Sequence, residues 1–286
     1  MLRVKVLGLE IEYEIYGKPG DPAVAVTPGG RYVKEMSGLP EMARAIAEGG
    51  RRVLLWDRPN SGGSDICFDA EHESLLHART LTALIRALDL GPTALAGGSA
   101  GSRVSLIAAA HDPEAISHLV LWWISGGAIG LMLLGYVYCC GNASTDSLGG
   151  MEGVAALPEW AELIKRKPHN RDIIMAQNPK TFIETMERWA AVYVPSKESP
   201  VPGMTPEDYK RVTMPTLVLR SGSNDVFHPR RNSEWLHQMI PHSEFIDPPW
   251  PDDEWNSRVL ASRRKAGGLL DRWPLLAPTI LEFTGK

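Results

Sequence analysis

One serine of the chain stands among small residues, in the segment Gly-Gly-Ser-Ala-Gly at 97–101. This G-x-S-x-G pattern is weak evidence by itself, but an apolar run, 93–96, leads into it and a stretch with helical spacing, 103–110, follows it. A tight strand-to-helix turn needs small neighbours, lifts the serine hydroxyl above the sheet, and points the N–H of Ala100 at a developing oxyanion. The pattern predicts Ser99 as a nucleophile; the alternative is a glycine-rich turn in an ordinary doubly wound fold.

Strands and helices alternate on both sides of this motif. After an expected hairpin at 3–16, short apolar runs stand at 23–26, 53–56, 93–96, 118–122, 216–220 and 244–247, and helical segments at about 39–48, 75–88, 103–110 and 232–239. Continuous apolar strands between helices indicate a parallel sheet that is covered on both faces. The alternation breaks at 126–206, where we expect helices at 151–166 and 179–193 and then a proline-rich exit. We therefore predict a core of residues 1–125 and 207–286 and a helical cap of residues 126–206.

These features together resemble the α/β-hydrolase superfamily. The resemblance is carried by the hairpin, the Pro-Gly-Gly turn at 28–30, the Asp-Arg-Pro-x-x-Gly-x-Ser loop at 57–64, the serine motif, the insertion and the late Gly-x-x-Asp loop at 222–225. It implies an α/β-hydrolase fold, with a mostly parallel twisted sheet, helices on both faces and an inserted helical cap. The motifs are specific for the fold and not for the substrate.

The resemblance also suggests partners for Ser99. Thr27-Pro-Gly-Gly30 lies where the superfamily has the turn that supplies a second oxyanion N–H, here expected from Gly30, although a plain loop is the alternative. Arg31 follows and would either meet a substrate carboxylate or face solvent. Asp225 lies at the usual acid position, where a carboxylate orients the base histidine; the alternative is an Asx-type turn.

The superfamily's base histidine has no counterpart at its usual place, because the segment after the last strand, 244–255, contains no histidine. In open parallel sheets the site lies beyond the carboxyl ends of the strands. Four histidines are expected elsewhere, at strand starts or helix ends: His111, His118, His237 and His242. His228 follows a strand and is the first candidate base. His77 is the second candidate base; it lies with His72 near the start of a helix that begins on the same side of the sheet. His169 lies in the cap.

A carboxylate of Asp253 or Glu254 is a lesser candidate, since an ordinary carboxylate is a weak base toward a hydroxyl unless burial raises its pKa. Aromatic residues gather near the expected mouth of the site, and we assign substrate contacts to Trp123 and Trp250, together with Arg31. These aromatic side chains indicate an apolar or aromatic small-molecule substrate, or else only the core of the cap interface.

Composition narrows the remaining function classes. The net charge is −4 and no Lys/Arg cluster marks a nucleic-acid interface. Three cysteines, without metal-ligand spacing, predict neither a disulfide framework nor a metal site, and we expect no cofactor. The start lacks a signal-peptide pattern and the apolar stretch 129–140 is short and interrupted by glycine, so we expect a cytoplasmic protein without a membrane partner. That stretch favours either a cap helix or a homodimer interface.

Three functions fit these observations. The first is a serine hydrolase of a small apolar ester, a lactone or a carbon–carbon bond next to a ketone, with Ser99, Asp225 and His228 as catalytic residues and Gly30 and Ala100 as oxyanion donors. The second is a lyase, isomerase or cyclase that uses the same pocket without an acyl-enzyme. The third is a non-catalytic ligand-binding protein, against which an intact serine turn argues.

Overall fold

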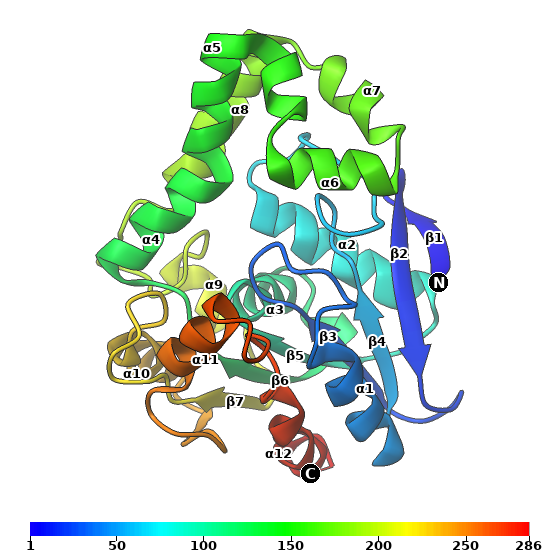
Figure 1. Cartoon of the computed structure of the whole chain (residues 1–286). Coiled ribbons are helices and arrows are strands. Elements are labelled where there is room, and N and C mark those ends of the chain that lie inside the picture. Colours follow the sequence, from blue (N-terminus) through cyan, green and yellow to red (C-terminus); the bar gives the residue numbers. More distant parts are fainter. Residues whose placement is uncertain (286) are drawn as a thin grey trace.

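A twisted eight-stranded sheet forms the centre of the computed structural model, which describes residues 1–285 (Figure 1). The strands lie in the order β1-β2-β4-β3-β5-β6-β7-β8. Their bounds are β1 Leu2–Val6, β2 Leu9–Tyr16, β3 Ala23–Thr27, β4 Arg52–Trp56, β5 Thr93–Gly98, β6 Ile116–Trp122, β7 Thr216–Leu219 and β8 Glu244–Ile246. The first two strands pair antiparallel, β2 pairs antiparallel with β4, and β3 to β8 run parallel to their neighbours. The predicted fold class, a mostly parallel sheet, is confirmed.

Helices cover both faces of this sheet. One face packs against α2 (Glu73–Ala87), α3 (Ala100–His111), α9 (Pro206–Lys210) and α10 (Arg230–Met239), and the other against α1 (Leu39–Glu48), α11 (Glu254–Arg263), the short helix η3 (Trp273–Leu276) and α12 (Ala277–Phe283). A single turn, η1 (Pro113–Ala115), precedes β6. Strands β3 and β5 are buried at every position, as their uninterrupted apolar runs predict for strands with helices on both sides. This arrangement brings the carboxyl ends of the parallel strands to one edge, below the cap.

A helical layer stands above that edge (Figure 1). It consists of α4 (Gly127–Gly135), the π-helix η2 (Tyr136–Cys140), α5 (Gly141–Ala155), α6 (Pro158–Arg166), α7 (Asn170–Met175) and α8 (Pro179–Ala191). The layer has its own core, in which Phe68 of the sheet domain packs edge-on against Trp160 and Phe182. All six helices lie within the range that the sequence assigned to the cap.

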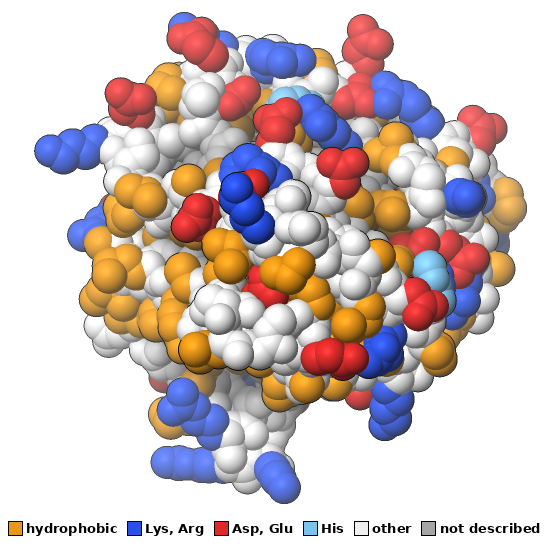
Figure 2. Space-filling view, turned by 90° about the horizontal axis from the view of Figure 1, so that it is seen from above, with side chains coloured by type: hydrophobic (Ala, Val, Ile, Leu, Met, Phe, Trp, Pro, Cys, Tyr) orange, Lys and Arg blue, Asp and Glu red, His pale blue; other side chains and the backbone are white. Residues whose placement is uncertain are grey.

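The helix expected at 151–166 is wrong in its extent. The chain leaves α5 after Ala155 and starts a new helix at Pro158, because proline fits a first helical turn and disrupts a helix interior. Sequence reasoning also assigned no definite helix to 127–150, where six glycines obscure the helical pattern. Within residues 1–285, the run Gly127–Arg166 is long and apolar enough to cross a membrane by length and composition alone, and a third of its most apolar window is buried in the protein. On the cap face in Figure 2, acidic and basic side chains are interspersed with hydrophobic ones.

Close backbone approach at the serine turn gives a first prediction. A Cβ added at Gly101 would overlap the carbonyl oxygen of Thr27, at the end of β3. We expect Gly101→Ala to lower the free energy of unfolding by about 1–3 kcal/mol, as overpacking does. Urea denaturation measures this change in the free energy of unfolding. Gly149→Ala, where an added Cβ would meet nothing within 4 Å, is the matched control and should change stability by less than about 1 kcal/mol. Equal losses in both variants would contradict the tight packing described for this turn.

Candidate active site

Ser99 occupies the sharp turn between β5 and α3. Its φ is +58°, a left-handed value that a residue with a side chain rarely adopts. Its backbone N–H donates to the carbonyl of Trp122 at 3.1 Å, and Ser102 Oγ donates to the carbonyl of Gly97 at 2.6 Å. These hydrogen bonds and the surrounding glycines hold the strained turn. The serine is thereby presented at the start of α3, beside helical N–H groups that lack acceptors within the helix.

A continuous line of hydrogen bonds joins Ser99 to two residues of one loop. Ser99 Oγ lies 2.8 Å from His228 Nε2, and His228 Nδ1 lies 2.8 Å from Asp225 Oδ2. An ionised carboxylate only accepts, so Nδ1–H donates to Asp225 and Nε2 of the neutral ring is free to accept from the serine hydroxyl. Asp225 and His228 are buried, with 4% and 2% of their surface exposed. The structure thus brings together the three residues that the sequence predicted as catalytic.

Asp225 performs two tasks with its two carboxylate oxygens. Oδ1 accepts from the backbone N–H groups of Phe227 and His228, both at 2.9 Å, and so closes an Asx-type turn. Oδ2 is left for the ring of His228. The two interpretations of Asp225, a turn residue and an acid that orients the base, therefore both describe the structure. Pro229 then ends the loop, and α10 begins at Arg230.

The segment after β8, where the superfamily's histidine was expected, braces this loop instead. The carboxylate of Asp252 accepts from the hydroxyl of Ser223 and from the guanidinium of Arg230, at the two ends of the loop. Asn256 Nδ2 also donates to the carbonyl of Asn224 at 3.0 Å. The histidine's usual position is thus occupied by residues that fix the loop carrying Asp225 and His228.

Two tryptophan rings enclose the imidazole of His228. Trp123 stacks on it with a centroid distance of 5.7 Å and an interplanar angle of 20°, and Trp255 meets it edge-on at 4.6 Å. Trp123 has a φ of +50°, which is unusual for so large a side chain. Backbone strain at the end of β6 therefore accompanies the placement of an aromatic ring on the base. Ser125 adds a second hydroxyl, 3.4 Å from Ser99 Oγ.

The turn after β3 forms the other wall. Arg58, itself buried, donates to the carbonyls of Gly29 at 3.1 Å and Gly30 at 2.6 Å, which fixes the turn from behind. Gly30 has a φ of +46° and lies with Ser99 on the same cavity. The predicted oxyanion donors, Gly30 and Ala100, therefore flank the serine, one on the turn and one at the start of α3.

The cavity at Ser99 is small, with a volume of about 70 Å³. Its wall consists of the glycine turn, aromatic residues and two leucines: Gly29, Gly30, Tyr32, Trp123, Leu134, Tyr138, Phe227, Trp255, Leu270 and Trp273. This volume is well below the roughly 300–1,000 Å³ of ordinary ligand pockets. A substrate therefore needs side chains of the wall to move, and Leu134 and Tyr138 belong to the cap.

Several predicted site residues lie outside this cavity. Arg31 turns away from it and pairs with Glu73 at 3.0 Å, with its guanidinium over the rings of Tyr138 and Trp160, because the cap covers it. Trp250 lines a neighbouring cavity of about 270 Å³, separated from Ser99 by Trp123 and Trp255. Of the three predicted substrate contacts, the cavity brings only Trp123 to the serine.

The other candidate bases are engaged elsewhere. His77 is buried and donates from Nε2 to the carbonyl of Pro59 at 2.9 Å. Asp253 accepts from Ser257, and Glu254 pairs with Arg272 at 2.6 Å. Sequence reasoning missed the contact of Trp255 with the base, for which its place among the aromatic residues of the last loop was the available signal.

Among residues 1–285, one set of three carboxylates has the spacing of metal ligands. Its members are Glu12, Glu35 and Asp57. The ammonium of Lys34 already lies among them, at 2.5, 2.5 and 3.2 Å. A resident cation of the chain thus lies at the centre of the group, with Arg3 and Arg166 paired to Glu12 and Glu35 from outside, and the group offers no place for a metal ion while Lys34 is there.

Known proteins share this architecture. Residues 28–123 match the family model of the alpha/beta hydrolase fold. The human serine hydrolase BPHL is 27% identical over 243 residues, 83% of this chain and 75% of that protein. A 2-hydroxy-6-oxononadienedioate/2-hydroxy-6-oxononatrienedioate hydrolase of Escherichia coli is 29% identical over 125 residues, 44% of this chain and 43% of that enzyme. The enol-lactonase from Burkholderia xenovorans LB400 superposes with a TM-score of 0.62 over 100% of both chains at 18% identity, a likeness of fold alone.

The fold, the serine turn and these relatives define the class of protein. Residues 28–123 match the alpha/beta hydrolase family, and the described chain as a whole has the α/β-hydrolase fold. The expected enzyme class, an α/β-fold hydrolase, is confirmed at this level, and the reaction and its residues are taken up below.

The buried His77 generates a prediction on acid stability. Burial lowers the pKa of His77 from 6.5 to about 3, so the unfolded chain binds a proton that the folded chain refuses as the pH falls through 6.5. The free energy of unfolding should decrease by ~1.4 kcal/mol per pH unit from this residue between pH 6.5 and 3. In His77→Gln the amide can still donate to Pro59. We expect the free energy of unfolding of this variant to decrease by about 2 kcal/mol less than that of the wild type between pH 7 and pH 5.

Urea denaturation at the two pH values measures this difference. His169→Gln is the control, because His169 is 57% exposed on the cap. A pH dependence in His77→Gln equal to that of the wild type would contradict the burial of a neutral imidazole at this position.

Proposed function

We propose that the chain is a serine hydrolase that cleaves a small ester or lactone, with Ser99 as nucleophile, His228 as general base and Asp225 as the residue that orients the base. The observation that carries this proposal is the unbroken hydrogen-bond line from Asp225 through His228 to Ser99. Nucleophile, base and orienting acid within hydrogen-bond reach are the signature of acyl transfer through a covalent intermediate.

In the first half of the reaction, Ser99 Oγ attacks the carbonyl carbon while its proton passes to His228 Nε2. The imidazolium is stabilised by the Asp225 carboxylate and by the face of Trp123. The N–H groups of Gly30 and Ala100 bind the oxyanion, each donor contributing ~10²–10³ in rate. When the tetrahedral intermediate collapses, Nε2–H gives its proton to the leaving alcohol and the acyl-enzyme remains.

In the second half, water takes the place of the alcohol. His228 Nε2 accepts a proton from the water as its oxygen attacks the acyl carbon, and the same two N–H groups bind the second oxyanion. Collapse returns the proton to Ser99 Oγ and releases the acid. No metal ion or organic cofactor takes part in these steps.

The relatives support a hydrolase and leave its substrate open. One is named a serine hydrolase, another a hydrolase of an oxo-dienedioate, and the structural neighbour an enol-lactonase. The cavity is lined mostly by aromatic and aliphatic side chains, which favours an apolar or aromatic group next to the reacting carbonyl. Cleavage of a carbon–carbon bond next to a ketone would use the same serine and ranks second.

The alternative of a lyase, isomerase or cyclase is favoured by the lack of a histidine at the superfamily's usual position after the last strand. With His228 Nε2 at 2.8 Å from the hydroxyl, that support is lost. The same contact argues against a non-catalytic binding protein.

A location in the cytoplasm without a membrane partner remains a prediction. So does a homodimer, for which the exposed side chains of Ile129, Met132 and Tyr136 on α4 and η2 offer a surface.

Variants of the catalytic line test the proposal. We expect the wild type to hydrolyse p-nitrophenyl butyrate and to be labelled at Ser99 by a fluorophosphonate. Ser99→Ala or His228→Ala should each lower kcat by ~10⁴-fold or more, and the double variant should be no slower than either single one, because the residues act as a unit. His169→Gln on the exposed cap surface serves as the control.

Stopped turnover with retained folding, checked by circular dichroism, would support these roles. A folded wild type that neither turns over the ester nor reacts with the fluorophosphonate would refute them. Full activity in His228→Ala would refute the role of His228 as general base without refuting the role of Ser99 as nucleophile.

The aromatic enclosure of His228 gives a further prediction. Trp255→Leu removes the edge-on contact, and we expect kcat/KM for the same ester to fall by ~2–10-fold, the range of one aromatic pair. Trp250→Leu is the matched control, because Trp250 contacts Trp123 at 5.9 Å and does not line the catalytic cavity. Steady-state kinetics would contradict the enclosure if Trp250→Leu lost more activity than Trp255→Leu.

A further inference from the structure

A group of three arginines, two of them buried, lies behind the cap wall of the catalytic cavity. It consists of Arg31 after the glycine turn, Arg58 after β4 and Arg103 near the start of α3, and we call it the arginine cluster. Arg58 and Arg103 are 1% and 4% exposed. The buried carboxylate of Glu73 pairs with Arg31, and the buried carboxylate of Asp57 attracts the guanidinium of Arg58. Among residues 1–285, Arg103 is the member of the cluster without a carboxylate partner.

The partners of each arginine show which guanidinium group lacks a negatively charged partner. Arg31 is paired with Glu73 at 3.0 Å. Arg58 donates to two backbone carbonyls of the glycine turn. Arg103 donates only to hydroxyls, to Ser74 at 2.8 Å and Tyr193 at 3.3 Å, and its guanidinium lies 5.4 Å from the centre of the Tyr193 ring.

The neighbouring histidine adds no charge, since burial lowers the pKa of His77 to about 3. Arg103 is therefore a buried cation that faces neutral groups. A buried charge without a counter-charge is costly, so such an arrangement calls for an anion that binds there.

Unused donors point the same way. Among residues 1–285, Arg103 Nη1 is buried without a hydrogen-bond partner, and so are the Nε atoms of Arg31 and Arg58. Buried donors without partners are rare in folded proteins, and each needs an explanation. The Nε atoms of Arg52, Arg220 and Arg258 are in the same state elsewhere in these residues, so the argument depends on Arg103 Nη1, whose guanidinium donates to hydroxyls and not to a carboxylate.

Tyr138 links the arginine cluster to the cavity. It lines the cavity at Ser99, and the Arg31 guanidinium lies 5.1 Å from the centre of its ring. On the other side its ring is 6.0 Å from that of Tyr193, the hydroxyl partner of Arg103. Burial raises the pKa of the Tyr138 phenol, and the positive charges of Arg103 and Arg31 act against this rise, so the phenol is within electrostatic reach of both.

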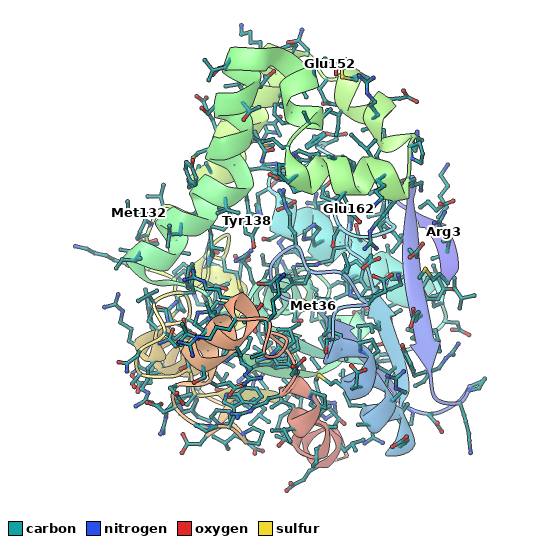
Figure 3. The ribbon with its side chains drawn as sticks, in the orientation of Figure 1. Arg3, Met36, Met132, Tyr138, Glu152 and Glu162 are labelled. Atoms are coloured by element: carbon teal, nitrogen blue, oxygen red, sulfur yellow. The ribbon has the colours of Figure 1, made fainter. Side chains whose placement is uncertain are left out.

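The backbone around Tyr138 departs from a regular α-helix. Tyr138 stands at the middle of the π-helix η2, a rare wide turn that occurs often at functional sites. Figure 3 shows the residue on the cap helix above the sheet domain, between α4 and α5. Because Arg103 and Tyr193 do not line the cavity at Ser99, contact between a ligand in that cavity and Arg103 requires this ring to move.

We propose that Arg103 binds a carboxylate of the substrate, so that the enzyme acts on an ester or lactone whose acyl part carries a free carboxylate group. The planar guanidinium presents its donors as a fork that matches two carboxylate oxygens. This inference rests on the proposed function, since the carboxylate is placed relative to a carbonyl at Ser99.

A matched pair of substrates tests it. The mono-p-nitrophenyl ester of adipic acid and p-nitrophenyl hexanoate have acyl chains of equal length, and only the first ends in a carboxylate. We expect wild-type kcat/KM to be ~10-fold or more higher for the adipate ester, and Arg103→Gln to lower the adipate-to-hexanoate ratio by ~10–100-fold, as for the loss of a charge-assisted hydrogen bond. Arg103→Lys, which keeps the charge without the fork, should fall between. Arg44→Gln, at a 54% exposed position, should leave the ratio unchanged.

Binding without turnover supplies an independent measurement. Adipate should raise the Tm of the wild type and not that of Arg103→Gln, because a ligand stabilises only the state that binds it. If Arg103→Gln does not fold, Arg103→Lys and the wild-type preference decide. Turnover of the hexanoate ester without a preference for the adipate ester, and without stabilisation by adipate, would overturn the carboxylate site and leave the hydrolase. Stabilisation by adipate without turnover of either ester would retain the site and refute the proposed function.

Discussion

The geometry at the nucleophile depends on how the carboxylate of Asp225 is shared. One oxygen holds the backbone of its own loop and the other holds the ring of His228, so a single side chain sets both the shape of the loop and the direction of the base. The proposed acid and the proposed base are only three residues apart, so a single loop carries both. The segment after β8 is then free to brace this loop through Asp252 and to supply Trp255 as a wall.

Much of this arrangement could be predicted from the sequence, because it follows from the edge at which parallel strands end. Ser99, Asp225 and His228 all follow strands at that edge, and this rule set aside four other histidines, while His72 and His77 remained on the same side as His228. The direction of the Arg31 side chain could not be predicted, since it is set by Glu73, more than forty residues away, and by rings of the cap. The helix boundaries of the cap were also inaccessible, because its glycines weaken the periodic signal on which such predictions depend.

The protein buries cations in two contrasting ways. Lys34 is surrounded by the carboxylates of Glu12, Glu35 and Asp57, so its charge has partners within the protein. Arg103 is buried to a similar degree with only hydroxyl partners. A buried cation without a carboxylate partner is costly, and this contrast with Lys34 is what supports the proposed ligand role of Arg103.

The small size of the cavity at Ser99 has a consequence for the order of events. A space of about 70 Å³ is too small for an ester to lie beside Ser99. Under the proposed mechanism, the cap side chains of Leu134 and Tyr138 must move to admit each reactant and to release each product. Any small nucleophile that entered by the same movement would compete with water for the proposed acyl-enzyme. The wall of the cavity, and not the proposed catalytic residues, would then decide the partition between hydrolysis and transfer to another acceptor.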